Sequence, residues 1–85
     1  MACYYKNMTA TGLVKEGPGK LKGFTVATTT SGTVKIWDAM AAEAPVLLNT
    51  ITPAAGSNYE FPDIQFTRGL FVTIANTIDM TIYYE

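Results

Sequence analysis

Apolar and polar residues alternate over short segments of this chain, and this alternation limits the possible folds more than any other feature. In the segment TVKIW (residues 33–37), the two aliphatic residues fall on one side of an extended strand and the other three residues on the opposite side. Glycine, proline and asparagine separate such segments at a spacing of about 8 to 12 residues, which is typical of a β-sandwich or small barrel. The sequence therefore predicts an all-β fold, an antiparallel β-sandwich of jelly-roll-like topology with roughly seven or eight short strands.

The same alternation places the individual strands and turns. Strands are predicted at residues 13–16, 21–28, 33–37, 46–52, 58–61, 70–75 and 78–84. Tight turns are predicted at residues 17–19, 30–32, 53–56, 62–63 and 76–77, and the last of these joins the final two strands into a hairpin. Gly23 indicates a bulge or a close approach of two strands. The predicted core consists of Val34, Ile36, Val72, Ile74, Met80 and Ile82.

Residues 38–44 (DAMAAEA) are the one candidate for helical structure in the chain. Asp38 has the residue type that caps a helix, and Pro45 follows the segment. Seven residues are too few for a stable helix, so we expect a loop with at most one helical turn.

The segment GTVKIWD (residues 32–38) is similar to the closing strand of a WD40 propeller blade. A propeller needs at least about four blades of roughly 40 to 45 residues each. This chain has 85 residues, one Trp and no His. A single amphipathic strand therefore explains the segment better than a blade does.

The composition indicates a small domain that binds partner molecules. Charged residues make up only 15% of the 85 residues, and hydrophobic residues make up 48%, so few charges remain to cover a free surface. The formal net charge is −1, which favours neither nucleic acid nor an anionic membrane as a partner. The chain starts without the apolar run of a signal peptide, so we expect synthesis and folding in a cytoplasm.

The side chains that enzymes use most are scarce. Without histidine, the commonest general base and metal ligand is missing, and a catalytic triad cannot form within one chain. Cys3 has no cysteine partner and no basic neighbour that would activate it. Glu60 and Asp63 flank Phe61-Pro62 and are interpreted as isolated surface carboxylates. We therefore expect no enzyme, no metal site and no cofactor.

Two pairs of tyrosines lie near the two ends of the chain, Tyr4-Tyr5 and Tyr83-Tyr84. Adjacent residues of a strand point to opposite faces, so one tyrosine of each pair must face away from the core. Exposed aromatic side chains are enriched where proteins meet proteins. The predicted interface residues are Tyr4, Tyr5, Trp37 and Tyr83, and the alternative is that they only cover the ends of the sandwich.

Five sequence blocks follow one another from Thr11 to Glu85: TGLVKEGPGKLKGFTV, SGTVKIWD, LLNTITPAAGSNYEFPD, FTRGLFVTI and NTIDMTIYYE. The order of these blocks resembles a family of small bacteriophage virion β-domain proteins, of the capsid decoration (cement) or head-fibre type. The resemblance covers residues 11–85 as one domain and leaves residues 1–10 as an N-terminal arm that we expect to reach a neighbouring subunit.

This resemblance implies a structural role on a phage particle, without catalytic residues. The protein would be made in the host cytoplasm, bind the outer surface of the capsid and stabilise the shell. Its partners would be the major capsid protein and further copies of itself, with a homotrimer favoured by analogy with proteins on local three-fold axes. The alternative function is a carbohydrate-binding or fibre- or tail-associated adhesion module, in which Trp37 and Tyr59 would stack on sugars.

Overall fold

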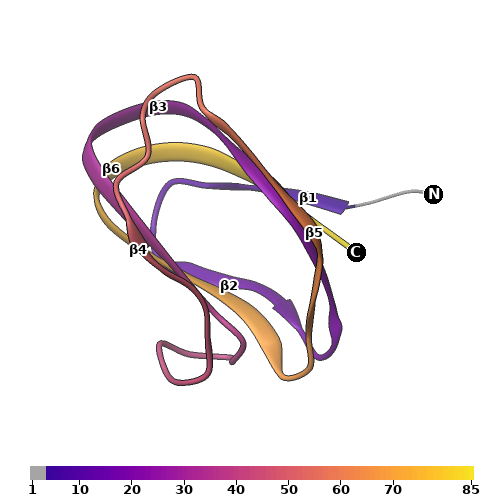
Figure 1. The fold of residues 1–85 in the computed structure, drawn as a ribbon. Coiled ribbons are helices and arrows are strands. Elements are labelled where there is room, and N and C mark those ends of the chain that lie inside the picture. The colour runs from indigo at the N-terminus through magenta and orange to yellow at the C-terminus, as the bar shows by residue number, and fades with distance from the viewer. Residues whose placement is uncertain (1–3) are drawn as a thin grey trace.

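The structure, a computed structural model, describes residues 4–85 and confirms the all-β class, since these residues form strands and loops without a helix (Figure 1). The strands are β1 (Tyr4–Met8), β2 (Gly12–Glu16), β3 (Gly19–Trp37), β4 (Val46–Ile51), β5 (Asn58–Phe66) and β6 (Gly69–Tyr84).

All strands belong to one open antiparallel sheet, built around the two long strands β3 and β6. These strands comprise 19 and 16 residues and pair along most of their length, from Leu21 opposite Tyr84 to Trp37 opposite Phe71. The outer edge of β6 carries β1 and β2, and the outer edge of β3 carries β5 and β4. The described residues thus form six strands in a single sheet instead of seven or eight short ones, and neither a separate second sheet nor a jelly-roll order appears among them.

The two central strands bend together at one corner, where the sequence predicted hairpin turns (Figure 1). The predictions of turns at residues 30–32 and 76–77 are wrong, because the chain continues in the same strand at both places. Ser31 and Asn76 adopt left-handed backbone conformations, with φ of 53° and 63°, and both Thr30 and Ser31 pair with Thr77. This bulge bends the ribbon without reversing it. The Asn76 side-chain amide donates a hydrogen bond of 2.7 Å to the Ser31 carbonyl across the corner.

The short strands stop near this corner, and other groups hydrogen-bond to the exposed edges there. On the β6 edge, the Thr11 hydroxyl accepts a bond from the Ile74 N–H at 2.9 Å and donates one to the Ile74 carbonyl at 3.1 Å. On the β3 edge, the Val26 N–H donates to the Ser57 carbonyl at 2.9 Å, and the Gly56 N–H donates to the Val26 carbonyl at 2.8 Å. These hydrogen bonds give the backbone groups of Ile74 and of the buried Val26 partners at edges where no strand pairs with them, and they stabilise the bend.

The bend brings the apolar faces of both halves of the sheet into one core. Five of the six predicted core residues are fully buried, and Ile74 is half-buried and packs against the cluster. The alternation predicted for residues 33–37 is confirmed, since Val34 and Ile36 are buried and their neighbours are not. The core cluster consists of Met8, Val14, Leu21, Phe24, Val26, Val34, Ile36, Phe66, Leu70, Val72, Ile78, Met80 and Ile82.

Strand β5 is longer than predicted, because it continues through Pro62 and Asp63 instead of ending there. The register shifts here, so that Glu60 lies opposite Gly23 whereas Ile64 lies opposite Leu21, and Asp63 has a φ of 50°. Proline is tolerated at such a bulge on an edge strand, where no neighbouring strand needs its missing N–H.

The segment predicted as an arm contributes strand β1 to the sheet, and Met8 belongs to the core. Tyr4 and Tyr5 remain exposed on this edge strand. Cys3 and the two residues before it lie outside the described residues.

Asp38 holds a turn of the sheet and does not cap a helix. The segment that follows Asp38 forms bends and irregular structure without a helix, and Asp38 itself is buried, with 8% of the residue exposed. Asp38 Oδ1 accepts hydrogen bonds from the N–H groups of Thr67 and Arg68 at 3.0 and 2.9 Å, and Oδ2 accepts one from the Thr67 hydroxyl at 3.4 Å. Asp38 therefore fixes the connection between β5 and β6.

We expect Asp38→Ala to lower the free energy of unfolding by about 1 to 3 kcal/mol, because two backbone N–H groups lose their acceptor. Urea denaturation of the purified protein measures this loss. Glu16→Ala, at an exposed acidic position, is the control and should change stability by less than about 0.5 kcal/mol. Equal stability of the two variants would contradict this role of Asp38.

Candidate functional site

The outer face of the sheet, opposite the core, carries two rows of side chains across β1, β6, β3 and β5. Residues opposite each other in neighbouring strands share a face of the sheet. The strand registers therefore define one row of Tyr5, Tyr83, Gly23 and Glu60, and a second row of Asn7, Thr81, Thr25 and Asn58.

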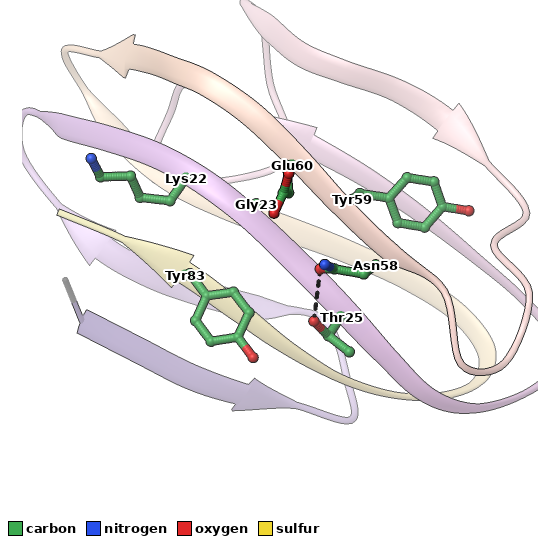
Figure 2. Close-up of a pocket in the computed structure, with 7 residues that line it drawn as sticks. All are labelled: Lys22, Gly23, Thr25, Asn58, Tyr59, Glu60 and Tyr83. Atoms are coloured by element: carbon green, nitrogen blue, oxygen red, sulfur yellow. Dashed lines mark hydrogen bonds between the residues drawn. The ribbon is translucent and has the colours of Figure 1, made fainter.

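The first row is interrupted at Gly23, which has no side chain to stand between Tyr83 and Glu60. A pocket of about 470 Å³ lies over this position, and Figure 2 shows the residues around it. We call it the Gly23 notch. Its lining residues are Lys22, Gly23, Thr25, Asn58, Tyr59, Glu60 and Tyr83.

Glycine is required at position 23 because β3 and β5 approach each other closely there. A Cβ atom on Gly23 would collide with the Tyr59 carbonyl oxygen and lie 3.2 Å from the Glu60 Cα. The φ of Gly23 is 153°, which side chains other than hydrogen rarely allow. The floor of the notch is therefore main chain.

Polar groups on β3 and β5 border the notch. The Thr25 hydroxyl donates a hydrogen bond of 3.0 Å to Asn58 Oδ1, which fixes the orientation of the amide (Figure 2). Asn58 and Glu60 are exposed, so the amide and the carboxylate are accessible from solvent. Together these groups can both donate and accept hydrogen bonds.

Lys22 also lines the notch, and acidic residues beside it balance its charge. Its Nζ lies 2.8 Å from Asp63 Oδ1 and 3.7 Å from Glu85 Oε2. The hydrogen bond from Lys22 is the main reason that the pKa of the Asp63 carboxyl lies below its ordinary value. Desolvation opposes this effect, and the charges of Lys22 and Lys20 add smaller contributions that lower the pKa. Asp63 is thus bound to a lysine and is not an isolated carboxylate.

Three of the four predicted interface residues gather at the β1 edge of the sheet. Tyr4 and Tyr5 are 64% and 73% exposed, and Tyr5 lies opposite Tyr83 on the outer face. The Tyr4 ring lies 5.9 Å from the ring of Tyr84, which packs against the core. Of the C-terminal pair, Tyr83 is therefore the residue that faces outward.

Trp37, the fourth predicted interface residue, lies in the other half of the sheet. Its indole N–H donates to the Thr73 hydroxyl at 2.9 Å, and Lys35 Nζ lies 4.4 Å from the ring centroid. Tyr59, the second predicted sugar platform, stacks on the buried Phe24 ring with centroids 4.7 Å apart. Trp37 therefore lies away from Tyr83, and Tyr59 lines the notch together with Tyr83 while its ring stacks on the core residue Phe24.

Comparison of the chain with protein-family models, curated proteins and solved structures finds no match. Within residues 4–85, no group of three or more cysteine or acidic side chains is placed to hold a metal ion. The same part of the chain contains no helix long and apolar enough to cross a membrane.

Proposed function

We propose that this protein is a structural component of a bacteriophage particle, a decoration (cement) protein that binds the outer surface of the capsid and stabilises the shell. The observation that carries this proposal is the pair of exposed aromatic side chains, Tyr4 and Tyr5, on the edge strand β1. The ordered sequence blocks described above supply the link to a phage particle.

The β1 edge has the features of a docking surface. Strand β1 pairs with β6 on one side and with no described strand on the other, so its free edge offers backbone hydrogen-bonding groups to an extended segment of a partner. Tyrosines are enriched among the residues that dominate binding energy at protein interfaces. We propose the major capsid protein as the partner at this edge.

Binding of this kind stabilises a shell by linkage. A protein that binds the assembled lattice and not the free subunits favours the assembled state, and many copies multiply a modest effect at each site. The bent sheet encloses one apolar core, which gives the protein a compact shape for this task.

We further propose that the protein associates with itself, as a trimer. The low content of charged residues and the exposed tyrosines support association. Light scattering of the purified protein tests this proposal, and a monomer at micromolar concentration would contradict self-association in the absence of a capsid.

The experiment compares phage particles assembled with and without this protein. We expect mass spectrometry to find many copies per particle, and particles that lack the protein to release DNA at a lower temperature. Absence of the protein from purified particles would refute the proposal.

A matched set of variants tests whether the β1 edge binds the capsid. Truncation of a dominant interface aromatic weakens binding by at least about 2 kcal/mol, or about thirtyfold in the dissociation constant. We expect this loss for Tyr4→Ala or Tyr5→Ala. Met40→Ala, at a position that is 49% exposed on the loop after β3, is the control and should retain full occupancy on particles. Equal occupancy of all three variants would remove the β1 edge from the proposal.

A further inference from the structure

We propose that the Gly23 notch binds a single neutral sugar ring, of the hexose type. This inference goes beyond the virion role and concerns an adjacent surface, since the notch is lined by β3, β5 and Tyr83 of β6, whereas the docking edge is β1 with Tyr4 and Tyr5. It replaces Trp37 and Tyr59, the platforms expected from the sequence, with Tyr83 and polar groups around Gly23.

The shape of the notch fits a small ring. Its volume of about 470 Å³ lies within the range of small-molecule pockets, roughly 300 to 1,000 Å³. Gly23 lines the notch with main chain alone, because the direction in which a side chain would extend is occupied by the backbone of β5. Figure 2 shows Tyr83, Asn58 and Thr25 around the position of Gly23, and all three line the same pocket.

The Tyr83 ring supplies the apolar contact. Tyr83 is half-buried on the outer face, opposite Gly23 in the register. An aromatic ring carries negative charge on its face, which attracts the weakly positive C–H groups of a sugar ring. The side chain therefore offers a wall against which the C–H face of a hexose packs.

The polar groups match adjacent hydroxyl groups. Asn58 Oδ1 already accepts the Thr25 hydroxyl at 3.0 Å, so its amide nitrogen is directed away from this bond and can donate to a ligand oxygen. The exposed Glu60 carboxylate has two oxygens that can accept from two neighbouring hydroxyls. Hydroxyl groups both donate and accept, and a sugar therefore satisfies both the amide and the carboxylate.

The charges around the notch disfavour anionic ligands. Glu60 repels phosphates and carboxylates, and the Lys22 ammonium is already balanced by Asp63 at 2.8 Å and Glu85 at 3.7 Å. A neutral ligand rich in hydroxyl groups avoids this repulsion and can still donate hydrogen bonds to the Glu60 carboxylate.

The test is titration of the purified, isotope-labelled protein with methyl glycosides of glucose, galactose, mannose and N-acetylglucosamine, followed by the backbone amide signals in NMR. Trp37 lies in the other half of the sheet, so its fluorescence is not a suitable readout. We expect at least one glycoside to cause saturable shifts centred on Gly23, Thr25 and Glu60, with millimolar affinity, as few contacts allow. Titration with the free reducing hexoses distinguishes a glycan end, which the methyl glycosides imitate, from a free sugar.

Two variants with matched controls test the assignment. Glu60→Gln and Tyr83→Leu should each weaken binding about tenfold, the effect of losing a charge-assisted hydrogen bond or an aromatic wall. Glu16→Gln and Tyr4→Leu make the same chemical changes at exposed positions outside the notch and should bind as the parent does. Backbone amide NMR signals that remain as widely dispersed as those of the parent protein show that each variant is folded.

Three results would overturn the proposal: no saturable shift with any of the glycosides, shifts centred elsewhere, or unchanged affinity in folded Glu60→Gln and Tyr83→Leu. Tighter binding of inorganic phosphate than of every glycoside would also overturn it. None of these outcomes bears on the virion role, which is measured on particles and at the β1 edge.

Discussion

Replacement of Ile36 by alanine is expected to lower the free energy of unfolding by about 2 to 5 kcal/mol. Ile36 is fully buried and lies opposite Val72 of β6 and Leu48 of β4. Truncation of its side chain therefore leaves a cavity in the core. A domain of this size has a total stability on the order of 4 to 13 kcal/mol, so this single change removes a large share of it.

Ile74→Ala is the matched comparison, because it removes the same atoms from a half-buried side chain at the margin of the core. We expect less than half the loss seen at Ile36, since part of the Ile74 side chain is already in water. Urea denaturation measures the free energy of unfolding of both variants, and the two values can be compared directly when the m-values are equal. An equal loss of unfolding free energy in the two variants would mean that Ile74 is buried as deeply as Ile36, which contradicts the packing described above.

The part of the core that was predicted depends on local alternation alone, whereas other core residues such as Met8 and Phe66 were not predicted. In the segment around Val34 and Ile36, and again around Met80 and Ile82, every second residue is apolar, and these are the residues that the structure buries. Alternation fixes which face of a strand is buried whatever strand lies beside it. For the same reason Tyr83 was expected to face outward.

The connection between the strand segments was not predictable from the same signals. Residues such as Ser31 and Asn76, which tolerate a positive φ, occur both in tight hairpin turns and in bulges that bend a continuing strand. What distinguishes the two is the pairing of β3 with β6, which joins residues far apart in the chain. Two turn signals that face each other across a pair of strands therefore indicated two hairpins, whereas the structure has one corner.

The Gly23 notch was not predictable for a related reason. Its row is made by Tyr83 on β6, Gly23 on β3 and Glu60 on β5, and no two of these are close in sequence. The sequence indicated that Gly23 was special, as a bulge or a close contact, and the close contact with β5 is confirmed. Its neighbours across the sheet follow only from the register.

The second large loss of stability is expected for Gly32→Ala, at the corner where β3 and β6 bend. Gly32 is buried beside the bulge, and an added Cβ would collide with the Ile78 side chain and lie 2.7 Å from the Thr77 carbonyl oxygen. Ile78 is buried and cannot swing into solvent, and the carbonyl belongs to the paired strand. Overpacking of a core lowers the free energy of unfolding by up to about 3 kcal/mol in typical cases. We expect a loss of about this size for Gly32→Ala, measured by urea denaturation.

Gly12→Ala is the control, because its added Cβ would meet only the end of the Met8 side chain at an ordinary 3.5 Å, and we expect a change within about 0.5 kcal/mol. The double variant Gly32→Ala, Ile78→Ala identifies the cause of the loss. Removal of the Ile78 side chain opens the space that the new methyl group needs, so the double variant should be more stable than the sum of the two single losses predicts, by about 0.5 to 3 kcal/mol. Because the Thr77 carbonyl remains in place, the recovery is expected to be partial. Simple additivity would show that Gly32 and Ile78 do not touch, and the bend at Ser31 and Asn76 would then need a different packing.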